Sequence, residues 1–268
     1  MCRLHKFWVE QKKEVSSVPE ERYDLMRQIP IQLFYSALIL MISVAFLPCV
    51  VAEKTDEDLT TQAGIFSVLE TGSYDRITTV DEMNSKGDLG VGGFEKMDGE
   101  LIQINGTIYQ VTSDGVVHTP SGDTGVTFMN TVKFNPELTH EFNHTENLTE
   151  LEDELEQSFP SRDCIYAIRI DGFFPEMSVR SIPVQQKPYP PLSSVIANQS
   201  VFNLTSSTGT ISGFWFPAWM QGVNYAGYHL HYITADRTSG GHILGCTIEN
   251  GTAMMDPIHS FKAATEAE

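Results

Sequence analysis

Three histidines in the C-terminal part of the sequence have the spacing of a metal-binding group. The segment from Gly227 to Thr234 alternates as a β-strand does, so His229 and His231 project from the same face. A turn-rich stretch then leads to His242, which opens a returning strand and lies near the pair if the two strands form a hairpin. The sequence does not fix the register of that hairpin. Three converging imidazoles are the ligands of an open catalytic zinc site, where the ion polarises a substrate oxygen as a Lewis acid.

Two other interpretations of the three histidines stay open. A His-x-His pair on a strand is often only exposed or hydrogen-bonded, although a third histidine after a Gly-Gly turn favours metal binding. A cupin-like iron oxygenase also carries His-x-His on a strand, but such enzymes usually add a glutamate where this chain has Ala235 and Asp236. The remaining histidines after residue 52 are predicted to be surface residues, namely His118, His140, His144 and His259.

Further motifs occur in a fixed order along the chain. They are GDLGVGGF at 87–94, MDGELI at 97–102, RSIPVQ at 180–185, KPYP at 187–190, GFWFP at 213–217 and PIH at 257–259. Together with the histidine segment at 227–244, they resemble the motifs of bacterial acetolactate decarboxylases. The resemblance covers about residues 64–261, and several separate motifs are far more specific than three histidines.

The resemblance implies a two-domain α/β protein, usually dimeric, that converts 2-acetolactate to acetoin and carbon dioxide. It implies Zn²⁺ bound by His229, His231 and His242, and it places Glu100 and Arg180 at the metal pocket. The guanidinium suits a carboxylate or enediolate partner, and the carboxyl group suits proton relay or orientation of a metal-bound water. Without the resemblance, Glu100 reads as a solvated carboxylate and Arg180 as part of a surface ion pair. Neither a Schiff-base lysine nor an organic cofactor is required.

The C-terminal end departs from the family pattern. Family members usually continue past the Pro-Ile-His segment and bring a further glutamate to the active site. Here Glu266 and Glu268 are the only candidates, and neither aligns with that glutamate. A glycoprotein that keeps the fold and the zinc but has lost turnover is therefore a further alternative.

The pattern of elements predicts an α+β (mixed α/β) fold with two β-rich subdomains and few helices. A capping box at Thr79 and Glu82 predicts a short helix ending near Gly87, and residues 146–159 form an amphipathic helix. The Asn105-Gly106 pair predicts a hairpin between 100–104 and 107–111. Further strands are expected at 125–134, 164–170, 177–182, 208–216, 225–234 and 242–248.

The glycine-rich segment 87–94 is predicted to be a turn where backbones approach closely, because no strand precedes it as a nucleotide-binding loop requires. The organisation along the chain is then an N-terminal region at 1–52, a β-rich subdomain at 53–158, and a zinc-binding β-rich subdomain at 159–268.

Residues 29–52 form an apolar run that reads as a signal peptide or as an uncleaved membrane anchor. Either interpretation places the rest of the chain outside the cytosol, secreted or in the secretory lumen. Six N-x-[ST] sequons agree with a glycoprotein, at Asn105, Asn143, Asn147, Asn198, Asn203 and Asn250. Cys164 and Cys246 either pair in that compartment or remain separate thiols.

The charge balance excludes one class of partner. The chain has 35 acidic and 17 basic residues, a formal net charge of -18, and no basic stripe. Such a surface repels phosphates, so nucleic-acid binding is not expected. The expected partner is the small-molecule substrate 2-acetolactate, with a second copy of the chain as a homodimer.

Overall fold

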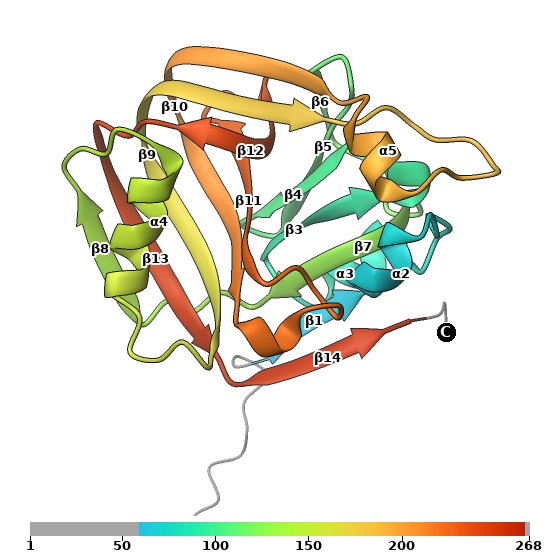
Figure 1. Cartoon of the computed structure of the whole chain (residues 1–268), viewed down its shortest axis with the longest axis horizontal. Coiled ribbons are helices and arrows are strands. Elements are labelled where there is room, and N and C mark those ends of the chain that lie inside the picture. Colours follow the sequence, from blue (N-terminus) through green and yellow to red (C-terminus); the bar gives the residue numbers. More distant parts are fainter. Residues whose placement is uncertain (1–58, 266–268) are drawn as a thin grey trace, which may run out of the picture. The chain divides into compact units, whose positions relative to one another are not determined.

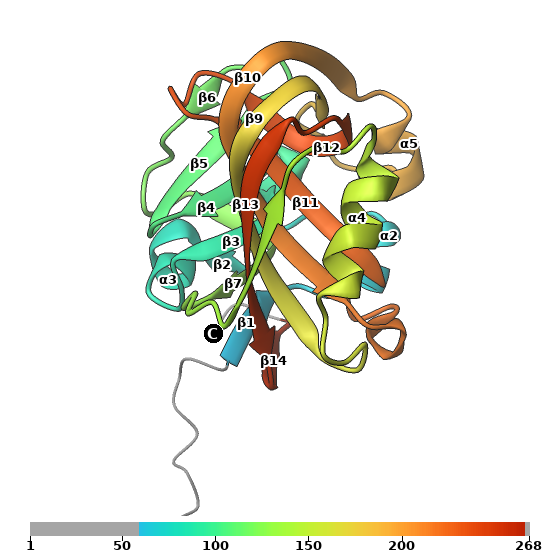
Figure 2. The same cartoon turned by 90° about the vertical axis from the view of Figure 1, so that its left-hand side faces the viewer.

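Strands dominate the described residues, 59–265, and form two sheets that pack face to face (Figures 1 and 2). In the computed structural model these residues belong to one compact unit. The predicted N-terminal region at 1–52, Glu266 and Glu268 lie outside the described residues. No helix within 59–265 is long and apolar enough to span a membrane.

The first sheet is built almost entirely from the N-terminal half of the described chain. Its strand order is β14-β1-β7-β3-β4-β5-β6, and β2 pairs with β7. The strands are β1 (Leu59–Ala63), β2 (Thr78–Thr79), β3 (Leu89–Phe94), β4 (Glu100–Ile104), β5 (Thr107–Val111), β6 (Val117–His118), β7 (Gly125–Val132) and β14 (Ser260–Ala264). Strand β14 pairs in parallel with β1, so the last described strand forms one edge of this sheet.

The second sheet follows the order β10-β11-β12-β9-β13-β8, with an additional pairing of β10 and β9. Its strands are β8 (Leu138–Phe142), β9 (Ile165–Ser181), β10 (Ser200–Phe216), β11 (Gly227–Thr234), β12 (Gly240–Cys246) and β13 (Asn250–Ile258). Since β9 contacts both β10 and β12, strands β9 to β12 close into a ring. The two long strands β9 and β10 arch together over the molecule (Figure 1).

Few helices accompany the sheets. They are α2 (Phe66–Glu70), α3 (Val80–Asn84), α4 (Leu148–Gln157) and α5 (Leu192–Ile196), with 3₁₀ turns η4 (Glu95–Met97) and η5 (Ala218–Met220). Helix α4 buries Leu151 and Leu155 in a core shared with β9, β11, β12 and β13. This matches the amphipathic helix predicted at 146–159, and the prediction of a strand-rich α+β fold is confirmed.

The predicted capping box and the predicted hairpin both form the hydrogen bonds expected of them. Thr79 and Glu82 form both halves of the predicted capping box at the start of α3. Strands β4 and β5 pair as the predicted hairpin, with Ile104 opposite Thr107. Asn105 and Gly106 both have positive φ angles, of 52° and 74°, as a two-residue turn of this type requires.

The prediction of a turn at 87–94 is wrong, because residues 89–94 are the fully buried strand β3. The close approach itself was correctly anticipated. A Cβ at Gly90 or Gly92 would lie 2.5 Å from the Asn130 carbonyl oxygen or 2.1 Å from that of Phe128. The glycines therefore let β3 and β7 lie unusually close, and they do so within a strand.

The predicted strands at 164–170 and 177–182 are parts of the single strand β9. The subdomain boundary between 158 and 159 remains a prediction, although both sheets take strands across it. β8 joins the second sheet from the N-terminal side, and β14 joins the first sheet from the C-terminal side. Cys164 and Cys246 are free thiols, which matches the second of the two alternatives.

Candidate metal centre

The register of the second sheet aligns two histidines and an arginine in one cross-strand row. His231 on β11 lies opposite His242 on β12, and His242 lies opposite Arg180 on β9. His229 lies two residues before His231 on the same strand, so its side chain faces the same way. The hairpin register that the sequence left open is therefore the one that brings all three imidazoles together.

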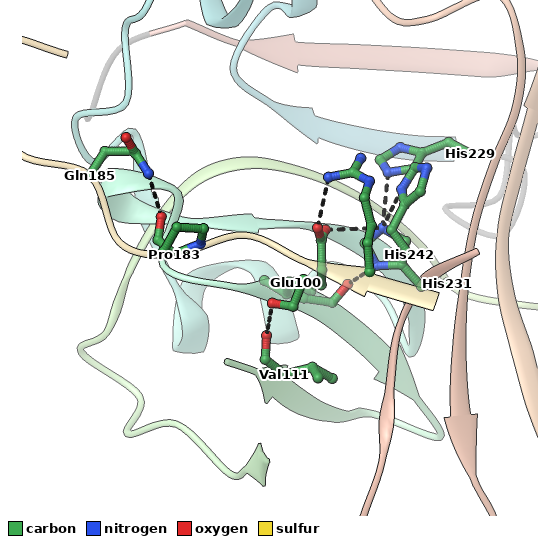
Figure 3. A network of polar contacts seen from close by, with 10 residues as sticks. Glu100, Val111, Pro183, Gln185, His229, His231 and His242 are labelled. Atoms are coloured by element: carbon green, nitrogen blue, oxygen red, sulfur yellow. Dashed lines mark hydrogen bonds and ion pairs between the residues drawn. The ribbon is translucent and has the colours of Figure 1, made fainter. Parts of the chain in front are cut away.

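The imidazole nitrogens converge closely enough to share one ion. His231 Nε2 lies 3.1 Å from His229 Nε2 and 3.2 Å from His242 Nδ1. Two nitrogens bound tetrahedrally at 2.0–2.1 Å from zinc lie roughly 3.3 Å apart. The spacing therefore fits a metal ion of that size. Figure 3 shows the three rings pointing toward one another, next to Glu100.

A backbone carbonyl fixes the orientation of the central histidine. His231 Nδ1 lies 2.9 Å from the carbonyl oxygen of Leu101 on β4, and the ring is completely buried. Because the carbonyl can only accept, Nδ1 carries the proton and Nε2 offers its lone pair to the centre. The first sheet thus orients a candidate metal ligand that the second sheet supplies.

Glu100 and Arg180 meet beside the histidines. Arg180 Nη1 donates to Glu100 Oε1 at 3.1 Å, and Glu100 Oε2 lies 3.5 Å from His231 Nε2. Glu100 is only 4% exposed, so it is not the solvated carboxylate of the alternative interpretation. The Arg180 side chain is 12% exposed, so this is no surface ion pair either.

A cavity of about 560 Å³ opens onto this group, within the roughly 300–1,000 Å³ typical of small-molecule sites. Its polar end holds Glu100, Arg180, His229 and His242. Another part of the lining is apolar and comprises Phe66, Leu69, Met97, Phe128, Ile182 and Leu192. Glu152 and Glu156 of α4, together with Tyr225 and Tyr228, also line it.

Comparison with known proteins shows which family the chain belongs to. The alpha-acetolactate decarboxylase family model matches residues 60–268. The chain belongs to this family. The alpha-acetolactate decarboxylase of Methanosarcina mazei is 37% identical over 199 residues, 74% of this chain and 69% of the relative. The Bacillus subtilis enzyme is 37% identical over 191 residues, covering 71% of this chain and 75% of the relative.

Solved structures agree with this membership. The crystal structure of alpha-acetolactate decarboxylase from Bacillus subtilis strain 168 superposes with a TM-score of 0.75 at 34% identity, over 76% of this chain and 88% of that chain. The family resemblance predicted from the motifs is confirmed, and so is the prediction of an enzyme. In this acetolactate decarboxylase family member, all five predicted site residues lie together, since Glu100 and Arg180 join the three histidines.

The site of this decarboxylase-family chain favours neutral imidazoles. Burial, together with the nearby Arg180 charge, lowers the pKa of His229 to about 4. Burial also brings the pKa values of His231 and His242 well below the ordinary value, with Arg180 contributing to both. Neutral imidazole is the form that binds a metal ion, so the three rings are ready to do so at neutral pH.

A buried amide network holds the loop that carries Tyr225 over the cavity. The Asn224 side-chain amide donates to Gln62 Oε1 at 2.8 Å and to Asn130 Oδ1 at 2.7 Å. Asn224 Oδ1 accepts from the backbone N–H of Tyr225 at 2.7 Å. This network ties the loop between β10 and β11 to the first sheet.

Sequence reasoning missed the Leu101 carbonyl, the Asn224 network and the apolar wall. A backbone carbonyl carries no residue-type signal, and Asn224 reads as an ordinary loop asparagine. Phe128 and Met97 read as core residues, because apolar residues that line a cavity have the same local pattern as those that fill a core. Among the surface histidines, His118, His144 and His259 are exposed, whereas His140 is partly buried against Glu154 of α4, at 3.0 Å.

Proposed function

We propose that this chain decarboxylates 2-acetolactate to acetoin and carbon dioxide, with zinc held by His229, His231 and His242. The observation that carries the proposal is the convergence of three neutral imidazoles beside the buried Arg180–Glu100 pair in one cavity. Family membership supports the substrate, because the relatives from Methanosarcina mazei and Bacillus subtilis are named for that reaction.

The histidine set fits zinc by chemistry as well as by spacing. Imidazole nitrogen suits zinc, and three protein ligands leave a coordination position for substrate. When bound, zinc would supply Lewis-acid polarisation of the substrate hydroxyl and ketone oxygens. The chain itself then has to bind the carboxylate, exclude water and move one proton.

Arg180 is placed to bind the anionic substrate. Its guanidinium is permanently charged and lies at the polar end of the cavity. During decarboxylation the bond between C1 and C2 breaks, carbon dioxide leaves, and the electron pair moves onto the ketone oxygen to give an enediolate. Arg180 stabilises that developing negative charge through hydrogen bonds.

Glu100 is the candidate proton donor. Burial raises the pKa of its carboxyl group, and the charge of Arg180 opposes that shift. A carboxyl group with a raised pKa holds its proton closer to neutral pH than a solvated glutamate does. Delivery of one proton to C2 of the enediolate produces acetoin, which completes the reaction.

Metal content and turnover of the full chain test the proposal. The full-length protein is expected to bind about one zinc per chain and to form acetoin from 2-acetolactate. His231→Ala should lose most of the zinc and at least 100-fold in rate, because the central ligand is missing. The matched control is His118→Ala, which removes an exposed histidine and should change neither value. An unchanged zinc content and rate in His231→Ala would overturn the site assignment.

The same measurements separate the alternatives. Protein that binds zinc but forms no acetoin would be the inactive relative considered from the sequence. Protein that selects iron and consumes oxygen would be the cupin-like oxygenase. Family membership favours the decarboxylase over both.

We also propose that the chain is exported, glycosylated and dimeric. The asparagines of all six sequons are exposed, as glycan attachment requires, namely Asn105, Asn143, Asn147, Asn198, Asn203 and Asn250. Expression in a eukaryotic secretory host should give a protein whose mass falls on treatment with peptide N-glycosidase. Light scattering of that protein should give twice the mass of the glycosylated chain, and a monomer would refute the dimer.

A further inference from the structure

Neither the backbone conformation nor the space around position 93 requires a glycine there. A Cβ at this position would meet Met97 Cε at 3.7 Å and the Gly99 carbonyl oxygen at 3.8 Å, which are ordinary contacts. Its φ angle lies outside the left-handed region that favours glycine. By contrast, Gly90 and Gly92 on the same strand would collide with the backbone of β7. The missing side chain at position 93 therefore needs another explanation.

The space above Gly93 belongs to the cavity of the metal centre. Gly93 lies opposite Glu100 on β4 and opposite Phe128 on β7, so the three residues form one cross-strand row. Directly paired residues point to the same face of a sheet. All three line the cavity. A side chain at position 93 would thus project into the cavity between the carboxyl group and the aromatic ring.

Gly93 lies where the polar end of the cavity meets its apolar end. On one side, Glu100 contacts Arg180 and lies 3.5 Å from His231 Nε2. On the other side, Met97 and Phe128 are 6% and 3% exposed and form an apolar wall. The Phe128 ring also stacks against the His229 imidazole, with centroids 6.3 Å apart. A molecule bound by its oxygens at the histidines and Arg180 therefore turns its apolar part toward Gly93.

We propose that Gly93 sets the size of the alkyl group accepted on the substrate carbon that carries the hydroxyl and the carboxylate. The inference rests on the proposed function, and it names the position in this chain that limits the alkyl group of its 2-alkyl-2-hydroxy-3-oxo acid substrates. The carboxylate, hydroxyl and ketone oxygens occupy the polar end. The alkyl group then fills the space that a side chain at position 93 would take.

Two substitutions narrow this space in steps. Gly93→Ala adds one methyl group with ordinary contacts, and Gly93→Val adds more volume. The matched control is Gly245→Ala on β12, where a Cβ meets nothing within 4 Å and does not face this cavity. Initial rates are measured for 2-hydroxy-3-oxobutanoates that carry methyl, ethyl or propyl at C2.

The expected result is a shift of the size limit. The unmodified protein turns over all three homologues, with kcat/KM values within tenfold of one another. Gly93→Ala lowers kcat/KM for the propyl homologue at least tenfold and for the methyl homologue less than threefold, since one methylene is worth roughly 10–200-fold in such pockets. Gly93→Val extends the loss to the ethyl homologue. Equal losses for all three homologues, or none, would overturn the inference.

Calorimetry separates failure of this inference from failure of the proposed function. The probes are the 2-hydroxy-2-methyl derivatives of propanoate, butanoate and pentanoate, which have no ketone and cannot decarboxylate. Zinc-loaded protein should bind all three, and Gly93→Ala should weaken the pentanoate derivative at least tenfold relative to the propanoate derivative. If Gly93→Ala weakens binding of the larger probes as expected, but the unmodified protein forms no acetoin, only the decarboxylase function is refuted. If acetoin forms, but Gly93→Ala leaves the relative affinities of the three probes unchanged, only the role of Gly93 is refuted.

Discussion

At the scale of single residues, Glu100 combines burial, a charged partner and proximity to the metal ligands. Glu100→Gln keeps the shape of the side chain but removes its acidic proton. We expect kcat/KM to fall at least roughly 100-fold, the lower range for general acid–base catalysis, while zinc content stays unchanged. Plasma mass spectrometry and an acetoin assay measure the two values. Exposed Glu249→Gln serves as the control, and a variant that loses zinc and rate together would assign Glu100 to the metal instead.

A second residue-scale prediction concerns Cys246, which is 5% exposed. Burial raises the pKa of its thiol to about 12. In the unfolded chain the thiol ionises near pH 8.5, so above that pH the folded state holds more protons and stability falls as pH rises. Between pH 9 and 11, wild type should lose roughly 2–3 kcal/mol more than Cys246→Ala, as measured by urea unfolding. Parallel pH profiles of the two proteins would contradict this.

At the scale of elements, the loop between β10 and β11 depends on Asn224. Asn224→Ala leaves the buried Asn130 Oδ1 without its donor, whereas Gln62 Oε1 keeps the bond from the Asn130 amide, and one such unsatisfied group costs about 1–3 kcal/mol. We expect the free energy of unfolding to fall by about 1–3 kcal/mol and KM to rise as Tyr225 loses its support. Denaturant unfolding and steady-state kinetics measure these changes. Asn135→Ala, at an exposed loop position, should alter neither value.

Elements with local signals could be predicted from the sequence, and those that depend on distant neighbours could not. The capping box at Thr79 and the Asn105-Gly106 turn act within a few residues, so their patterns were sufficient. Strand β3 was missed because its glycines fit a turn equally well until the backbone of β7 is known to lie against them. The continuity of β9 likewise depends on β10 and β13 pairing along its two edges.

At the scale of the whole molecule, the candidate metal centre joins the two sheets. His231 and His242 belong to the second sheet, while the Leu101 carbonyl and Glu100 belong to the first. Removal of zinc with dipicolinate should therefore lower Tm by roughly 5–10 °C, which corresponds to zinc at 100 times its Kd. Differential scanning calorimetry measures the shift, and added zinc should reverse it. His231→Ala should show no shift with chelator, and an equal shift there would mean that zinc acts elsewhere.

The residues of the site likewise fall into two groups: those that a local sequence pattern predicts and those that only the fold brings together. The three histidines could be predicted because one hairpin contains them all, although their register came only from the sheet. Glu100 and Arg180 were inferred from family motifs, because nothing in their local pattern distinguishes them from surface charges. The space at Gly93 could not be predicted, since it arises from three strands that meet in the fold.

The separation of these groups along the chain has a consequence for assembly. His229 and His242 lie 13 positions apart, whereas 80 positions separate Glu100 from Arg180. A short loop closes at low entropic cost and early in folding, while the distant pair waits for the sheets to dock. The three candidate metal ligands can therefore come together in folding before Glu100 and Arg180 meet. Because the Leu101 carbonyl that orients His231 also belongs to the first sheet, tight metal binding and turnover would both require that the sheets have docked.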